Sequence, residues 1–262
     1  FINRKESETM DKLKIGAQLY TVRDFMKTPE EMAASLKKIH SIGFETVQVS
    51  GIGPVDWERD LAAMLKENQL TCVATHVPLD RMEQDLEQLV REHQAVGSPL
   101  MGIGAMPSEY RNEEGCHAFA QRMNRIGHNL KGSGIKLSYH NHRFEFFRTK
   151  DGRRTGLELL MEETDPECVE FILDTYWIVA GGANPADYIR KYPGRNQVIH
   201  FKDMVIVEDQ QEMTECGRGN IDFSAITPVC QTMGVAHAVI EQDICKGDPF
   251  ESLAVSFANL TK

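Results

Sequence analysis

Short stretches of β-forming residues alternate with amphipathic helical patterns along the chain, and this alternation limits the fold more than any other feature. Eight such stretches occur, and they cover residues 14–20, 46–50, 71–77, 100–105, 136–142, 169–176, 198–203 and 236–243. Strands that alternate with helices are typical of βα units and a parallel sheet. The sequence therefore predicts an α/β protein built from eight parallel strands, each followed by a helical segment.

The segments between these stretches carry the spacing and the end signals of helices. Apolar residues recur three or four positions apart, as at Met32, Leu36 and Ile39, which gives each helix one face to bury on a sheet. Thr28 and Asn184 each precede a proline, the order expected of an N-cap and a first helical residue. Glycines follow helical segments and precede strands at positions 43, 97, 134 and 234, where a left-handed C-cap favours glycine.

The number of units and the length of the chain favour a closed barrel. Eight βα units in about 250 residues fit a (β/α)8 TIM barrel, and no linker rich in Gly, Ser or Pro divides the chain. A doubly wound open sheet is the competing fold, but neither GIGP (51–54) nor GIGA (102–105) matches its G-x-G-x-x-G phosphate turn. We expect a single-domain TIM barrel over residues 13–262 and a disordered N-terminal extension over residues 1–12, which are polar and lack periodicity.

Composition makes several other classes unfavourable. The 29 basic and 39 acidic residues give a formal net charge of −10, which disfavours a nucleic-acid partner, since binding to phosphates depends on Lys and Arg. Six scattered cysteines include no C-x-x-C pair, so neither a zinc knuckle nor a disulfide framework is indicated. No apolar run approaches the roughly 18 residues of a membrane span, and no signal-peptide pattern is present. We expect a cytoplasmic protein without a membrane partner.

Polar residues gather at the C-terminal ends of the predicted strands, where TIM barrels carry their active sites. Neighbouring strands lie about 4.8 Å apart, so side chains at consecutive ends can converge on one centre. Carboxylate and imidazole ligands without thiolate suit Mn²⁺, Co²⁺, Mg²⁺ or Zn²⁺. The sequence therefore predicts a site for one divalent metal ion, with ligands drawn from the ends of the last four strands: His140, His142 or Glu145, then Asp174, His200 and Glu241.

Further polar residues could contact a substrate at the same end of the barrel. Lys202 and Arg23 could hold a phosphate, a carboxylate or sugar hydroxyls, while Gln18 and His76 could position hydroxyls from the far rim. Residues 204–220 form a long connection for a βα loop and include two glycines, so we expect either a lid or a phosphate-binding nest. The acidic middle of this segment favours the lid.

Seven motifs in this chain resemble those of one known family, the xylose-isomerase-like sugar phosphate isomerase/epimerase barrels. That family also includes the endonuclease IV group and inosose dehydratases. The resemblance runs from about Lys14 to the C-terminus, and its motifs in this order are specific for the family but not for a substrate. They are GAQLYTVR (16–23), YHNHRFEF (139–146), LDTYW (173–177), NPADYI (184–189), HFKD (200–203), GRGNIDF (217–223) and IEQD (240–243).

The resemblance implies a set of ligands and a wall for the substrate. In the family, one divalent metal is held at the ends of strands five to eight, and Asp174, His200 and Glu241 match three of the ligand positions. His140 stands where many relatives have a ligand Glu, so we expect Glu145 or His142 as the fourth ligand and His140 as a substrate contact. Sugar epimerases often have a His where this chain has Trp177, and an indole there favours a stacked glycoside or cyclitol ring over a simple ketose.

These residues predict proton transfer beside a carbonyl. A metal bound to two neighbouring sugar oxygens stabilises the enediolate that forms when the adjacent C–H loses its proton. Glu241 and either Glu145 or His142 are the candidate bases. We expect a metal-dependent sugar or sugar phosphate isomerase/epimerase. The alternative is a metal-dependent carbon–oxygen lyase, or dehydratase, that acts on a keto-inositol or a 3-keto-glycoside and expels a β-substituent.

Two other classes fit the sequence less well. A nuclease like endonuclease IV would need ligands for three metal ions and a basic face for DNA, and this acidic chain shows ligands for one. A non-catalytic sugar-binding barrel would keep its role after Glu241→Gln. We therefore expect a small-molecule carbohydrate as the partner, and the sequence leaves a homo-oligomer open.

Overall fold

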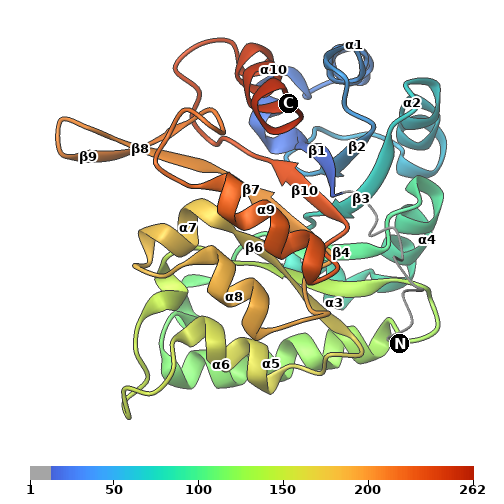
Figure 1. The fold of residues 1–262 in the computed structure, drawn as a ribbon. Helices are drawn as coiled ribbons and strands as arrows, with labels where there is room; N and C mark the ends of the chain where they lie inside the picture. Colours follow the sequence, from blue (N-terminus) through green and yellow to red (C-terminus); the bar gives the residue numbers. More distant parts are fainter. Residues whose placement is uncertain (1–12) are drawn as a thin grey trace, which may run out of the picture.

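The eight predicted strands form one parallel sheet that curls into a nearly closed barrel (Figure 1). The structure, a computed structural model, describes residues 13–262, so the predicted disordered extension over 1–12 lies outside the described residues. The predicted (β/α)8 TIM barrel is confirmed. Around the barrel the strand order is β3-β2-β1-β10-β7-β6-β5-β4. The bounds are β1 Lys14–Gln18, β2 Thr46–Val49, β3 Thr71–Thr75, β4 Leu100–Ile103, β5 Lys136–His140, β6 Val169–Asp174, β7 Val198–Phe201 and β10 His237–Ile240.

The two edge strands of the sheet, β3 and β4, meet at a seam. There the backbone N–H of Val77 donates a hydrogen bond of 3.0 Å to the carbonyl oxygen of Gly102. A Cβ atom at Gly102 would lie 2.1 Å from the carbonyl oxygen of Thr75, so a glycine is needed for the edges to approach this closely.

Helices cover the outside of the barrel and bury the apolar faces that the sequence predicts. Met32, Leu36 and Ile39 of α1 are fully buried, and Thr28 caps that helix in a capping box with Glu31. Among residues 13–262 no helix is both long and apolar enough to cross a bilayer. The α-helices are α1 Pro29–Ile42, α2 Ala62–Glu67, α3 Leu79–Gln84, α4 Leu86–Val96, α5 Glu113–Asn129, α6 Gly156–Glu163, α7 Thr175–Ala180, α8 Pro185–Lys191, α9 Phe223–Thr232 and α10 Pro249–Leu260. There are also three 3-10 helices, η1 Leu19–Phe25, η3 Ser108–Tyr110 and η4 Phe144–Phe146, and a π-helix, η2 Trp57–Leu61.

The long connection after β7 is an antiparallel hairpin rather than an irregular loop. Strands β8 Asp203–Val207 and β9 Gln210–Thr214 pair along their length and project away from the barrel (Figure 1). The carboxylate of Asp203 accepts hydrogen bonds from the backbone N–H groups of Gly217, Gly219 and Ile221 at 2.9–3.1 Å. Because Asp203 takes these donors, they are not left to bind a phosphate as a nest would.

A small apolar layer inside the barrel supports its polar C-terminal end. Ile172, Val198 and Val239 precede Asp174, His200 and Glu241 by two positions each, and residues two apart in a strand point to the same face. These three belong to an apolar cluster separate from the main core, together with Val73, Ala74 and Leu100. The polar side chains therefore lie one layer above an apolar floor.

Candidate metal centre

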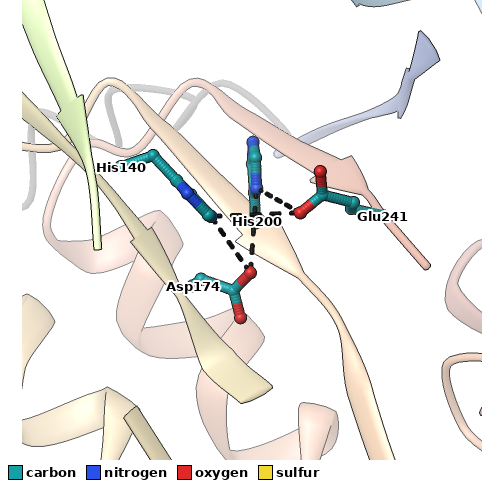
Figure 2. A group of neighbouring side chains, drawn as sticks. All are labelled: His140, Asp174, His200 and Glu241. Carbon is teal, nitrogen blue, oxygen red and sulfur yellow. Dashed lines mark hydrogen bonds and ion pairs between the residues drawn. The ribbon is translucent and has the colours of Figure 1, made fainter. Parts of the chain in front are cut away.

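Four buried side chains from consecutive strands converge at the C-terminal end of the barrel. His140 is the last residue of β5, Asp174 the last of β6, His200 lies in β7, and Glu241 directly follows β10. Asp174 pairs in register with His200, which places the two at the same height. Each residue offers one ligand atom, and these atoms all lie within 4.8 Å of one another. Figure 2 shows the side chains pointing toward a common centre, and we call them the four-residue group.

The distances within this group fit a small divalent cation. Oδ2 of Asp174 lies 3.2 Å from Nε2 of His140 and 3.8 Å from Nδ1 of His200. Oε2 of Glu241 lies 3.0 Å from Nδ1 of His200 and 3.9 Å from Nε2 of His140. Ligand atoms held tetrahedrally at about 2.1 Å from a metal would be roughly 3.4 Å apart. Two carboxylate oxygens and two imidazole nitrogens at this spacing could hold one such ion.

The outer nitrogens of both histidines face oxygen acceptors. Nε2 of His200 lies 2.6 Å from Oε1 of Gln48, and Nδ1 of His140 lies 3.1 Å from the carbonyl oxygen of Gly104. An outer N–H that donates to an oxygen leaves the inner nitrogen with a free lone pair, which is the tautomer that a metal requires. Both rings can therefore turn their inner nitrogen to a cation. Nδ1 of His200 has to release a proton to do so, because, against the effect of burial, Glu241 and Asp174 raise the pKa of His200 to about 9. Gln48 was not among the predicted site residues, although it is an isolated polar residue in the apolar strand TVQV.

Gln48→Leu is expected to weaken metal binding by about 10- to 100-fold, because His200 loses the acceptor that fixes its tautomer. The measurement is competition with a chelator of known affinity. Gln48→Glu provides the matched control, since its carboxylate can still accept from Nε2 and should retain tight binding. Equal affinities for Gln48→Leu and the wild type would show that this contact does not orient the ligand.

The ammonium of Lys202 lies between three carboxylates next to the group. Its Nζ is 2.9 Å from Glu241, 2.8 Å from Asp243 and 3.4 Å from Asp174. Burial opposes the charged form, but the three carboxylates raise the pKa of Lys202 above its usual value. Lys202 is thus a fixed positive charge whose ammonium is already paired with these carboxylates. Its side chain also lines the pocket next to the group.

A pocket of about 350 Å³ opens above the four-residue group, and we call it the metal pocket. Two further imidazoles line it, His76 and His142. Burial is the main cause that lowers the pKa of His142 to about 3 and that of His76 well below its usual value, so both rings are neutral at pH 7. A neutral imidazole offers one donor and one acceptor to a substrate.

Glu145 lies outside the four-residue group. Its buried carboxylate accepts hydrogen bonds from the hydroxyl of Tyr139 at 2.5 Å and from the backbone N–H of His142 at 2.9 Å. The short helix η4 turns this side chain back against β5, so His140, rather than Glu145 or His142, is the residue from this segment that joins the group. Glu145 supports the backbone of His142 and does not line the metal pocket.

The pKa of Glu145 predicts a pH-dependent stability. Burial raises its pKa from the ordinary 4.5 to about 8. The stability linked to its protonated form is therefore fully present below about pH 4.5 and is lost as the pH rises toward 8. Relative to the wild type, Glu145→Gln is expected to gain stability by about 1.4 kcal/mol per pH unit over this range. Urea unfolding of both proteins at pH 5 and 8 tests this, and a constant difference would contradict it.

The remaining predicted substrate contacts lie around the pocket rather than in it. Gln18 is buried and its side chain accepts from the backbone N–H of Tyr20 at 3.3 Å. Arg23 stacks on the ring of Tyr20 and donates to the carbonyl oxygens of Tyr20 and Asp243 at 2.9 Å. Trp177 packs beside His142, with 5.2 Å between ring centres. Of the predicted contacts, His76, His140 and Lys202 line the metal pocket.

Comparison with known proteins places this geometry in a family. The sequence profile of the xylose isomerase-like TIM barrel family matches residues 36–244. The inosose dehydratase of Clostridium beijerinckii is 29% identical over 160 residues, which is 54% of this chain and 52% of the relative. An inosose dehydratase of Lacticaseibacillus casei is also 29% identical, over 150 residues, 50% of this chain and 49% of the relative. The chain thus spans about half the length of the curated relatives it matches.

Solved structures agree on the fold. A sugar phosphate isomerase/epimerase from Parabacteroides distasonis has a TM-score of 0.79 at 24% identity. The match covers 97% of this chain and 94% of the Parabacteroides chain. The probable 3-DHS dehydratase from Bacillus anthracis has a TM-score of 0.74 at 14% identity. The match covers 95% of this chain and 99% of the Bacillus protein. The profile match over most of the barrel shows that the chain belongs to the xylose isomerase-like TIM barrel family.

Proposed function

We propose that this protein is a metal-dependent carbon–oxygen lyase. It removes a proton next to a carbonyl of a polyhydroxylated substrate and expels the oxygen substituent on the neighbouring carbon. The observation that carries the proposal is the buried four-residue group, which brings two imidazole nitrogens and two carboxylates within 4.8 Å of one another beneath an open pocket. The curated relatives named inosose dehydratase support elimination over other outcomes of the same proton transfer.

A bound divalent metal would supply Lewis-acid polarisation of the substrate carbonyl. Mn²⁺, Co²⁺, Mg²⁺ and Zn²⁺ all suit ligands of this kind, and we propose one such ion. His140, Asp174, His200 and Glu241 would hold it, and Lys202 keeps the carboxylates ionised, because its charge lowers the pKa of Asp174 and Glu241 against the effect of burial.

His142 is the residue best placed to take the proton. It lines the metal pocket and is neutral at pH 7, whereas Glu145 is buried away from the pocket and Glu241 is paired with Lys202. In the reaction the C–H proton passes to the imidazole of His142, and the C–H electron pair forms a new carbon–carbon double bond. The neighbouring C–O bond then breaks, and the oxygen leaves with its electron pair and takes up a proton.

A sugar isomerase or epimerase is the second candidate. Glu241 and His142 both line the metal pocket, so the site offers two groups that could exchange a proton with a bound sugar. Such an enzyme would return the proton to the substrate instead of expelling a substituent.

Solvent exchange separates these functions. The protein is stripped with a chelator, loaded with each divalent metal in turn, and incubated in D₂O with a keto-inositol and with a 3-keto-glucoside. Deuterium uptake with an eliminated product is expected, while uptake without elimination would support the isomerase or epimerase. No exchange with any keto-sugar would contradict both. His142→Gln is the matched variant, because it should bind metal normally and lose exchange.

A further inference from the structure

A second cavity adjoins the metal pocket above the ends of β2 and β3. Its volume is about 730 Å³, and Ser50, His76 and Gly104 line both spaces. We call it the side cavity. Because the two spaces meet at these three residues, a ligand held over the four-residue group has room to extend into the side cavity without leaving the protein.

The side cavity is mainly apolar away from this border. Its apolar lining includes Ile52, Pro54, Val55, Trp57, Val77 and Pro78. The partly exposed indole of Trp57 is backed by the ring of His93, with 5.8 Å between ring centres. An apolar cavity with an exposed indole is a surface on which a flat apolar group can stack.

The loop that forms one wall is already held in place. The backbone N–H of Gly53 donates to the carbonyl oxygen of Met26 at 2.7 Å, and a Cβ at Gly53 would lie 2.2 Å from the carbonyl oxygen of Lys27. This close approach fixes residues 51–55 against the segment before α1. A preformed cavity binds an apolar group without an entropic cost for ordering the loop.

Among residues 13–262, neither space offers a free cation for a phosphate group. In the side cavity, the basic lining residue is Arg81. Its guanidinium forms ion pairs of 3.0 Å with both Glu92 and Asp85. In the metal pocket, the basic lining residue is Lys202, and its ammonium is surrounded by three carboxylates. A phosphorylated substrate would have to displace one of these ion pairs.

We infer that the substrate is an unphosphorylated glycoside with an aromatic aglycone, and that the side cavity is the aglycone site. This inference rests on the proposed function for the position of the sugar over the four-residue group. His76 then lies at the bond between sugar and aglycone. Its buried Nε2 has no hydrogen-bond partner in the part of the chain that the structure describes, and there it meets a substrate oxygen. Its Nδ1 contacts the hydroxyl of Ser50 at 3.3 Å, which fixes the ring.

The chemistry of an aryl glycoside fits both spaces. In a sugar oxidised at C3, the proton at C2 is next to the carbonyl and the aglycone oxygen is on C1. Loss of the C2 proton to His142 forms a C1–C2 double bond, the bond from C1 to the aglycone oxygen breaks, and the aglycone leaves with that electron pair and a proton as a phenol. The aglycone is then the leaving group, and the side cavity decides which leaving groups are accepted.

Binding of unreactive probes tests the aglycone site without any turnover. Phenyl β-D-glucopyranoside and methyl β-D-glucopyranoside lack a carbonyl, and their affinities for the manganese-loaded protein are measured by calorimetry. We expect the phenyl probe to bind at least about tenfold tighter, since burial of a benzene ring is worth more than 1.4 kcal/mol. Trp57→Ala and Val55→Asp should bring the two affinities within about threefold and leave methyl glucoside unchanged.

Phe25→Ala is the control, because Phe25 is an exposed aromatic residue outside both spaces, and it should keep the phenyl preference. Affinities that differ by less than threefold in the wild type, no binding of either probe, or a preference that survives both Trp57→Ala and Val55→Asp would overturn the inference. A phenyl preference without D₂O exchange of any keto-sugar would leave the aglycone site standing and reject the proposed lyase.

Discussion

Glu241→Gln is expected to lower both metal affinity and proton exchange by about 10³-fold. Oε2 of Glu241 lies 3.0 Å from Nδ1 of His200 and supplies one of the two negative charges in the four-residue group. Its replacement by a neutral amide removes several kcal/mol of electrostatic stabilisation from the cation and from the charge that the reaction develops. Metal affinity by calorimetry and deuterium exchange of a keto-sugar measure the two effects.

Glu170→Gln is the matched control for this prediction. Glu170 is also a buried glutamate on a barrel strand, but it lies near the start of β6 and pairs with Lys136 at 3.0 Å. Its replacement should leave metal affinity and exchange near the wild-type values. Wild-type metal affinity and exchange in Glu241→Gln would contradict the role of Glu241 as a ligand. If the wild type bound sugar without any exchange and Glu241→Gln bound it equally well, the barrel would be a non-catalytic sugar-binding protein.

Lys202→Met is expected to destabilise the metal-free protein by roughly 3–5 kcal/mol, the range for a buried charge that loses its partner. Asp174, Glu241 and Asp243 would share a buried space with no ammonium to balance them. A divalent cation restores positive charge at the same place, so added Mn²⁺ should stabilise the variant more than the wild type. Urea unfolding with and without Mn²⁺ measures both quantities.

The control for this variant is Lys27→Met, whose ammonium lies 3.6 Å from the carboxylate of Asp24 in a pair with both side chains more than half exposed. An exposed pair of this kind contributes about 1 kcal/mol or less, and its loss should not depend on metal. A metal-free Lys202→Met protein as stable as the wild type would show that the ammonium does not stabilise the carboxylates.

The parts of the site that could be predicted are those fixed by strand periodicity. Asp174, His200 and Glu241 lie at strand ends, and the register of a parallel barrel brings such ends together whatever the loops do. The same reasoning predicted the helices, because Met32, Leu36 and Ile39 can be buried on one face only if α1 forms.

The parts that could not be predicted depend on turns and tertiary contacts. Glu145 follows β5 by five residues, and the helix η4 and the hydroxyl of Tyr139 decide where its carboxylate points. The hairpin of β8 and β9 turns through Glu208 and Asp209, which both have positive φ. Hairpin turns of this kind favour Asn and Gly, so the sequence carries little signal for it. Gln48 reaches His200 across the barrel, a contact that spacing along the chain does not indicate.

The most direct test of the metal centre is anomalous scattering from a crystal grown with Mn²⁺, with data collected on both sides of the manganese absorption edge. One strong peak is expected among Nε2 of His140, Oδ2 of Asp174, Nδ1 of His200 and Oε2 of Glu241, about 2.1–2.2 Å from each. Absence of a peak there at saturating Mn²⁺, or a peak elsewhere with these side chains turned apart, would contradict the account.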